Sequence, residues 1–338
     1  MPIYIYKGNS QISTNAVRND KAVKAIYAKE QGKDVVCVWG RIPYEQMFTY
    51  SITDNKVKIT GLKPEVQTAY ITIPNIISDK QVDSIADSAF KNKTNIVNLM
   101  VSDNVTRIGS GAFSGCSSLE SITIPFVGAR AGVTSSDTYQ YPFGYMFGTS
   151  SYTGGTPTKQ NYHGSSTISG TYTTYYIPSS LKSVTVTGGN ILYGAFSGCS
   201  GLTSITFGNS VTSIGTAFSH CTGLTTVNWN ATECTSVGSF NTAPIFSTCP
   251  NLATVNIGDN VKIIPSDAFK DCSGLTSVTI GGGVTSIGNY VFDGCSRLTS
   301  ITFNGTKAQW RAIKKGPDWN YNTGNYTIHC TDGDIPKQ

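Results

Sequence analysis

One short unit repeats along this chain, and that repeat constrains the fold more than any other feature. A phenylalanine marks each copy, at Phe90, Phe113, Phe143, Phe196, Phe218, Phe246, Phe269 and Phe292. The intervals are 23, 30, 53, 22, 28, 23 and 23 residues, which a 23-residue unit with three lengthened copies explains. A repeat period of this length is the signature of a solenoid, a propeller or another repeat array.

Each copy contains a strand with one buried face. In "LTSITF" (202–207), Ile205 and Phe207 point to one side and Thr206 points to the other. The following "SVTSIG" adds two apolar residues and a glycine turn, and "AFSGC" predicts a short helical turn. A single unit cannot bury its own apolar face, but stacked units form a continuous core. We therefore expect a β-rich, right-handed solenoid of about eight repeats, with a parallel sheet along its concave side.

Six of the nine cysteines occupy the position three residues after the phenylalanine: Cys116, Cys199, Cys221, Cys249, Cys272 and Cys295. In the third copy this position holds Met146, a natural apolar substitute for a buried thiol. Side chains on neighbouring coils are parallel and about 4.8 Å apart, which narrowly misses disulfide geometry. No CxxC pair is present for zinc. We interpret these thiols as core packing and expect no metal and no cofactor.

The unit "AFSGCSSLESITIP" (112–125), followed by "VTSIG", resembles the BspA-type (Treponema pallidum-like) leucine-rich repeat. The segment that begins "FTYSITDNKVKITG" (48–90) is similar to the entry into that array, and the segment that begins "NGTKAQWRAIKKGPDWN" (304–335) is similar to its C-terminal cap. The resemblance covers residues 48–335 and implies a bacterial surface or secreted protein. Members with known roles bind host proteins, other cells or surfaces and are not enzymes.

This resemblance divides the chain into three parts. Residues 1–47 are expected to form a small β-rich N-terminal cap or appendage, 48–306 the solenoid, and 307–338 the C-terminal cap. The third copy carries an insertion of about 149–178, because its strand begins 38 residues after Phe143 instead of six. We expect the insertion to project from one lip of the concave groove. The sequence of residues 1–47 also resembles short N-terminal modules of phage tail and prophage-linked proteins.

Catalysis has no support in the residue pattern, so we predict that the protein is not an enzyme. The three histidines, His163, His220 and His329, have no partner at metal-ligand spacing, and no GxSxG, HExxH or P-loop motif occurs. His220 replaces the glycine of "FSGC", which predicts an exposed turn position rather than a Cys–His pair with Cys221.

Charge and hydropathy limit the partners and the location. The net charge is +5, and the basic residues are scattered, which disfavours nucleic acid as a partner. No run approaches 18 apolar residues, so membrane insertion is not expected. The start lacks the pattern of a secretory leader. We expect a monomer that is secreted or on the cell surface, either trimmed of its leader or associated with a virion.

Two surfaces are candidates for binding. The first is the outward side of the concave sheet, with Thr206, Asn228, Asn256 and Thr279. The second is a set of tyrosines in and just before the insertion: Tyr139, Tyr141, Tyr145, Tyr152, Tyr162, Tyr172, Tyr175 and Tyr176. Mixtures of tyrosine with glycine and serine are typical of recognition loops. Alternatively, the sheet residues reflect strand propensity and solubility, and the tyrosines cover the core of the lengthened unit.

These observations predict a non-enzymatic adhesion or recognition protein. Its partner would be a host extracellular protein or a surface glycan, or another bacterial macromolecule. The alternative is a structural or receptor-binding protein associated with a phage or prophage tail.

Overall fold

The computed structural model describes residues 43–135, 138–162, 171–237 and 244–337, together with four short strands before residue 43. It separates into two compact units, Met1–Met47 and Phe48–Gln338. In the first unit, β1 (Ile5–Lys7) pairs with β2 (Ser10–Ile12), and β3 (Ile26–Glu30) pairs with β4 (Lys33–Cys37), both antiparallel. A single helical turn, α1 (Tyr44–Met47), ends this unit. Its role as a cap or an appendage stays a prediction.

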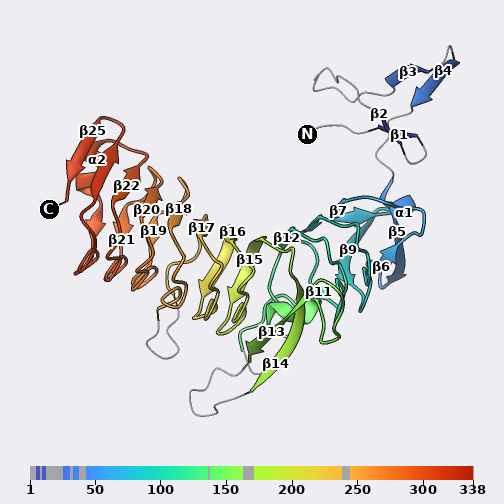
Figure 1. Ribbon diagram of the computed structural model, residues 1–338, viewed down its shortest axis with the longest axis horizontal. Helices are drawn as coiled ribbons and strands as arrows, with labels where there is room; N and C mark the ends of the chain where they lie inside the picture. Colours follow the sequence, from blue (N-terminus) through green and yellow to red (C-terminus); the bar gives the residue numbers. More distant parts are fainter. Residues whose placement is uncertain are drawn as a thin grey trace. The chain divides into compact units, whose positions relative to one another are not determined.

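The second unit is the predicted β-solenoid, built on an 11-stranded sheet. Ten of the strands run parallel: β7 (Tyr70–Ile73), β10 (Asn98–Val101), β12 (Ser121–Ile124), β15 (Ser183–Ile191), β16 (Ser204–Ile214), β17 (Thr226–Trp229), β18 (Thr254–Ile257), β20 (Ser277–Ile280), β22 (Ser300–Phe303) and β24 (Thr327–Cys330). The antiparallel β25 (Gly333–Pro336) closes the sheet at its C-terminal end. Figure 1 shows this sheet following the concave side of the solenoid.

The eight predicted repeats are present, and a further coil flanks them at each end. The repeats marked by phenylalanines supply β10 to β22, whereas β7 and β24 belong to coils without that marker. Other aromatic residues cover the ends of the phenylalanine row. Phe48 packs edge-to-face on Phe90 at 6.4 Å between ring centroids, and Trp319 packs on Phe292 at 6.2 Å. Counting phenylalanines therefore misses the two end coils, which contain β7 and β24.

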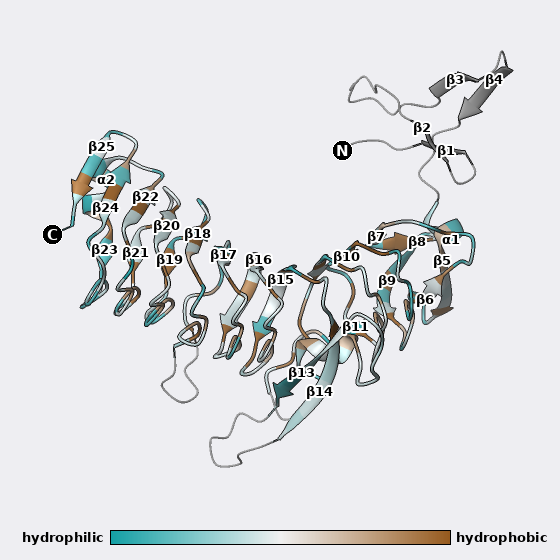
Figure 2. Cartoon of the chain, viewed as in Figure 1, coloured by the Kyte–Doolittle hydropathy of each residue, from teal (hydrophilic) through white to brown (hydrophobic). Residues whose placement is uncertain are grey.

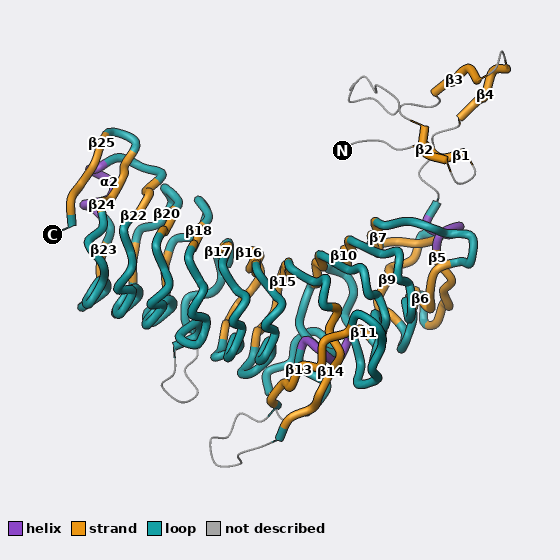
Figure 3. The backbone as a smooth tube through the Cα atoms, in the orientation of Figure 1, coloured by secondary structure: helices purple, strands orange, loops and turns teal. Residues whose placement is uncertain are grey.

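The "VTSIG" segments form a second, interrupted sheet system on the other side of the core. Near the N-terminal end, β5 (Phe48–Thr53), β6 (Lys56–Leu62), β8 (Ile76–Ile77), β9 (Lys80–Ile85) and β11 (Arg107–Ile108) form one sheet. Near the C-terminal end, β19 (Ile263–Ile264), β21 (Ser286–Ile287) and β23 (Lys314–Lys315) form another. Helical structure in the described residues is limited to short pieces, including α2 (Lys307–Ala312), as Figure 3 shows.

The core between the two sheet systems is a row of stacked aromatic rings. Consecutive phenylalanines lie 5.0 Å (Phe196–Phe218), 5.1 Å (Phe218–Phe246) and 5.9 Å (Phe246–Phe269) apart between centroids. Residues in the strands alternate between buried and partly exposed, as in β17 and β18. Apolar positions accordingly recur from coil to coil in Figure 2. Each coil thus buries its apolar face on its neighbours, as the sequence predicts.

The six repeated cysteines are buried free thiols. Four of them donate a hydrogen bond from Sγ to the backbone carbonyl of the phenylalanine in the preceding coil. These bonds are Cys116 to Phe90 (3.3 Å), Cys221 to Phe196 (3.2 Å), Cys249 to Phe218 (3.3 Å) and Cys295 to Phe269 (3.2 Å). The thiol therefore fills space and also gives a second hydrogen bond to a carbonyl that already accepts one from a backbone N–H, as Phe196 does from Cys199 at 3.1 Å.

We expect Cys221→Ala to lower the free energy of unfolding by about 1–3 kcal/mol, because it leaves a small cavity and removes the second hydrogen bond to the Phe196 carbonyl. Urea denaturation measures the change, and Thr222→Ala at the exposed neighbouring position is the control. A reductant should leave the melting temperature of the wild type unchanged. A marked drop in reductant would contradict the packing role.

Stability should also fall at alkaline pH because these thiols are buried. Burial raises the pKa of Cys116 and of Cys295 from the ordinary 9.0 to about 12. The folded state then keeps protons that the unfolded state releases, so the stabilisation is complete below pH 9 and is lost progressively towards pH 12. We expect Cys295→Ala to show a shallower loss of unfolding free energy between pH 9 and pH 11 than the wild type. Equal slopes would contradict this account.

Candidate binding surfaces

The third coil departs from the repeat, and the departure determines how the insertion is held. In regular coils the phenylalanine N–H donates to the carbonyl of the residue before the next phenylalanine, as Phe90 does to Ala112 at 2.7 Å. Phe113 instead donates to Met146, at 2.8 Å. Met146 therefore corresponds to the alanine position, and its prediction as a substitute for the thiol is wrong, although it is buried.

On its other side the third coil keeps the predicted register. The Phe143 N–H donates to Ala195 at 2.9 Å, and its ring lies 4.7 Å from that of Phe196. The ring next to Phe113 is Phe147, at 6.3 Å. A short 3-10 helix, η1 (Phe143–Met146), joins the two phenylalanines. The third coil thus presents one phenylalanine to each neighbour, four residues apart in sequence.

Gln160 fills the gap that this change leaves in the core. It comes from β13 (Gly155–Asn161) of the insertion and is fully buried. Its Oε1 accepts a hydrogen bond from the Gly144 N–H at 2.6 Å, and its Nε2 donates to the Ala195 carbonyl at 3.1 Å. The same Nε2 lies 3.3 Å from the Cys199 Sγ, which in other coils faces a phenylalanine carbonyl. Sequence reasoning missed Gln160, because nothing in "GTPTKQN" distinguishes a buried glutamine from a solvated one.

The second strand of the insertion is also anchored in the core. β14 (Tyr172–Pro178) pairs antiparallel with β13. The Tyr175 ring covers Gly144, where an added Cβ would come within 2.4 Å of the ring, and its hydroxyl donates to the Tyr139 carbonyl. The hairpin is therefore held to the third coil through Gly144 and Ala195. Figure 1 shows β13 and β14 on the side of the solenoid away from the concave sheet, and not at a lip of the concave groove. The reason is that the lengthened third coil cannot close its core without the hairpin.

Two of the tyrosines predicted as contact residues belong to this core. Tyr175 is 1% exposed, and Tyr141 is 3% exposed with its hydroxyl donating to the Asn161 carbonyl at 3.2 Å. Their rings are covered by their own chain, so the prediction that they contact a partner is corrected.

The other tyrosines retain exposed surface. Tyr145, Tyr162 and Tyr176 are half-buried, as is Tyr152, whose hydroxyl donates to the Tyr176 carbonyl at 2.9 Å. Tyr139 and Tyr172 are exposed. The structure brings Tyr139 within 6.4 Å of Tyr145, whereas Tyr172 pairs with Asn161 at the far end of the hairpin. The tyrosines do not form one patch, and their role in binding stays a prediction.

The concave sheet gathers the other predicted residues into one line. Strand register aligns its outward residues in two rows. The first row holds Tyr70, Asn98, Ser121, Ser183, Ser204, Thr226, Thr254, Ser277, Ser300 and Thr327. The second holds Thr72, Met100, Thr123, Thr185, Thr206, Asn228, Asn256, Thr279, Thr302 and His329. We call these twenty residues the concave rows.

Hydrogen bonds link side chains along the second row. Asn228 Nδ2 donates to Thr206 Oγ1 at 3.1 Å, and Asn256 Nδ2 donates to Asn228 Oδ1 at 2.9 Å. In the row through Asn98, the Ser121 hydroxyl donates to the Asn98 side chain. These contacts hold the amides in one orientation, so the face presents fixed donors and acceptors.

The histidines do not assemble a reactive site in the described residues. His220 is exposed, at the turn position predicted from its replacement of glycine, and its φ of 59° is left-handed. His329 Nδ1 lies 2.9 Å from Asp334 Oδ1 on the exposed β24–β25 hairpin. His163 lies outside the described residues. Within the described ranges, no three His, Cys, Asp or Glu side chains gather as metal ligands, and no helix is long and apolar enough to cross a membrane.

We expect Gln160→Leu to lower the free energy of unfolding by about 1–3 kcal/mol, because the buried Gly144 N–H loses its partner and the Ala195 carbonyl loses one of its two hydrogen bonds. Thermal and urea denaturation measure this change. Lys159→Ala, on the exposed side of the same strand, is the control. Equal stability of the Gln160→Leu protein and the wild type would show that the hairpin does not stabilise the third coil.

Comparison with known proteins agrees with this architecture. The BspA type leucine rich repeat region matches in six copies over residues 66–134 and 189–313, more than half of the chain. No curated protein sequence matches.

Several solved structures with similar folds are bacterial leucine-rich repeat proteins of low sequence identity. A T. pallidum leucine rich repeat protein is 20% identical and has a TM-score of 0.25, over 76% of this chain and 83% of that chain. A leucine rich cell surface protein from Faecalibacterium prausnitzii is 20% identical with a TM-score of 0.26, over 79% and 96%. A leucine-rich repeat protein from Eubacterium ventriosum is 19% identical with a TM-score of 0.36, over 86% and 97%. On its six matched repeats, the chain belongs to the family of BspA-type leucine-rich repeat proteins.

Proposed function

We propose that the solenoid is a non-enzymatic recognition module, on the cell surface or secreted, that binds a macromolecular partner along the concave rows. One observation carries this proposal. The chain has 25 basic and 20 acidic residues, yet none of them occupies the twenty positions of the concave rows. His329, at the C-terminal end, is the one titratable imidazole among them.

An uncharged face of this kind is suited to forming an interface. Hydroxyl and amide groups lose less hydration energy than charged groups when a partner covers them. The hydrogen bonds from Asn228 to Thr206 and from Asn256 to Asn228 already order those side chains. Less conformational entropy is then lost on binding, because the donors and acceptors are preorganised.

The N-terminal end of the concave rows adds apolar contact surface. Tyr70 is 63% exposed and Met100 is 51% exposed, and the register pairs Tyr70 with Asn98 and Met100 with Thr72, so the two lie diagonally across β7 and β10. Exposed aromatic and methionine side chains are frequent anchors in protein interfaces. Of the two predicted partner classes, this end favours a host extracellular protein over a glycan.

The exposed tyrosines in and just before the insertion form a separate part of the proposal. Tyr139 and Tyr172 offer ring surface away from the concave sheet. These two tyrosines would make a second contact with the partner that binds the concave rows. The alternative of a phage or prophage tail protein rests on residues 1–47, most of which lie outside the described ranges.

The test begins with an array of host extracellular matrix proteins and glycans, probed with the whole chain. For the partner found, we expect Tyr70→Ala to weaken binding by about tenfold, since it removes an exposed aromatic anchor. Asn228→Arg should weaken binding as well, because it places a charge in the middle of the uncharged face. Tyr321→Ala is the matched control, since Tyr321 is 58% exposed outside the concave rows. Equal affinities for all four proteins would contradict the concave rows as the site.

A further inference from the structure

A row of basic side chains crosses the sheet formed by β6, β9 and β11. In register, Lys58 lies opposite Ser84, Ser84 lies opposite Arg107, and Arg107 lies opposite Arg130 in the chain that follows β12. Residues in register across a sheet project from the same face. Lys58, Arg107 and Arg130 are all exposed, so this face carries three cations in one line.

The two arginines are an unfavourable pair without a ligand. The Ile108 N–H donates to the Ala129 carbonyl and the Ala131 N–H donates to the Thr106 carbonyl, both at 2.9 Å. Arg107 and Arg130 lie between these bonds and form a non-hydrogen-bonded antiparallel pair, with Cα atoms about 4.5 Å apart. Like charges directly opposite one another in this arrangement are destabilising.

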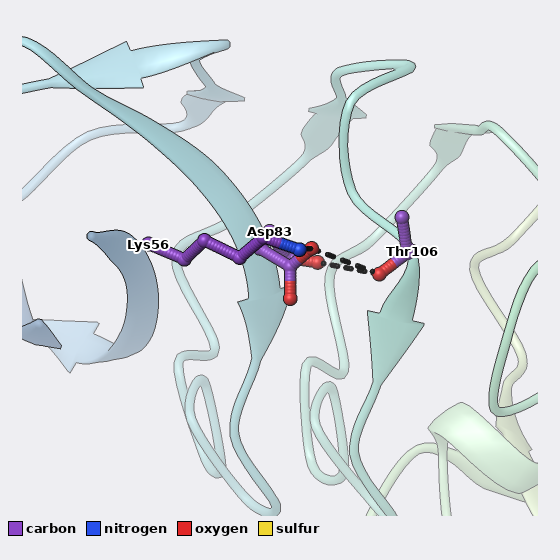
Figure 4. Close-up of polar contacts among 3 residues, drawn as sticks. All are labelled: Lys56, Asp83 and Thr106. Carbon is purple, nitrogen blue, oxygen red and sulfur yellow. Dashed lines mark hydrogen bonds and ion pairs between the residues drawn. The ribbon is translucent and has the colours of Figure 1, made fainter. Parts of the chain in front are cut away.

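Nearby acidic groups do not neutralise the row. Asp83 is held by Lys56 Nζ at 3.2 Å and by Thr106 Oγ1 at 3.1 Å, and Figure 4 shows its carboxylate between these side chains. Asp87 accepts a hydrogen bond from the Ser110 N–H at 2.8 Å. Among the described residues, no carboxylate forms an ion pair with Lys58, Arg107 or Arg130.

The row opens into a cavity of ≈ 460 Å³. Its lining includes the three cations, one carboxylate from Asp87, the Gln140 amide and the half-buried Tyr145 ring. Tyr139, whose ring is 6.4 Å from that of Tyr145, is exposed beside it. Arg130 and Gln140 also line a second cavity of ≈ 370 Å³. The site therefore combines excess positive charge with aromatic surface and room for more than a single ion.

We propose that this cavity binds an acidic saccharide, with a sulfate or carboxylate group between Arg107 and Arg130. Guanidinium groups bind such oxyanions through paired hydrogen bonds, and an anion between them removes the repulsion of the pair. The Tyr145 ring offers a face for a sugar ring, and Gln140 and Ser84 offer hydrogen bonds to sugar hydroxyls. This site lies on a different sheet from the concave rows and does not depend on the function proposed for them.

Isothermal titration of the full chain tests the proposal. The probes are a heparin-derived sulfated hexasaccharide, the same hexasaccharide after desulfation, a hexaglutamate peptide and inorganic sulfate. The variant Arg107→Gln/Arg130→Gln removes the arginine pair. The control variant Lys262→Gln/Arg297→Gln makes the same charge change at two exposed residues away from the cavity.

We expect the sulfated hexasaccharide to bind the wild type and the control alike, and to bind the arginine variant at least about tenfold more weakly. Desulfation should abolish binding. The arginine variant should also melt at a higher temperature than the wild type at low salt, since the repulsion is gone. If the control variant lost as much affinity for the hexasaccharide, net charge alone would explain the binding and the proposal would be overturned. Stronger binding of hexaglutamate, or sulfate binding as tight as the hexasaccharide, would also overturn a saccharide site.

Discussion

Everything in this solenoid depends on the way one coil covers the next. Each coil exposes an apolar edge that only a neighbouring coil can bury, so the row of phenylalanine rings is continuous from Phe90 to Phe292. Hydrogen bonds also link neighbouring coils, because the cysteine thiol of one coil donates to a phenylalanine carbonyl of the coil before it. A change in the length of any coil must therefore be compensated locally or the stack ends.

The third coil shows such a compensation. Its extra residues place Phe147 against one neighbour and Phe143 against the other. The Gly144 N–H then needs a side-chain partner, and the Ala195 carbonyl, which accepts the Phe143 N–H, can accept a second hydrogen bond. Gln160 binds both, and Tyr175 closes the space above Gly144. The insertion is thus part of the solenoid core, and only its outer face remains for contacts with other molecules.

The concave rows are uncharged, whereas the row of Lys58, Arg107 and Arg130 is basic. Their positions in the repeat explain this difference. Outward residues of the concave strands are aligned over ten coils, so any charge there would face a like position in the next coil, and the rows are uncharged. The flanking sheet is interrupted at the third coil, where the chain returns as an antiparallel segment and places Arg130 beside Arg107. A cavity and an excess of positive charge coincide at that irregularity.

The sequence by itself determined the repeat, the buried and exposed positions of each strand, the turn at His220 and the packing role of the cysteines. These follow from local periodicity, because every coil repeats the same contacts with its neighbours. Only the tertiary structure decided the roles of Gln160, Tyr141 and Tyr175, and the register that joins Arg107 to Arg130. Those depend on contacts where the period fails. Residues far apart in the chain meet there, and no neighbouring copy of the unit supplies a template for them.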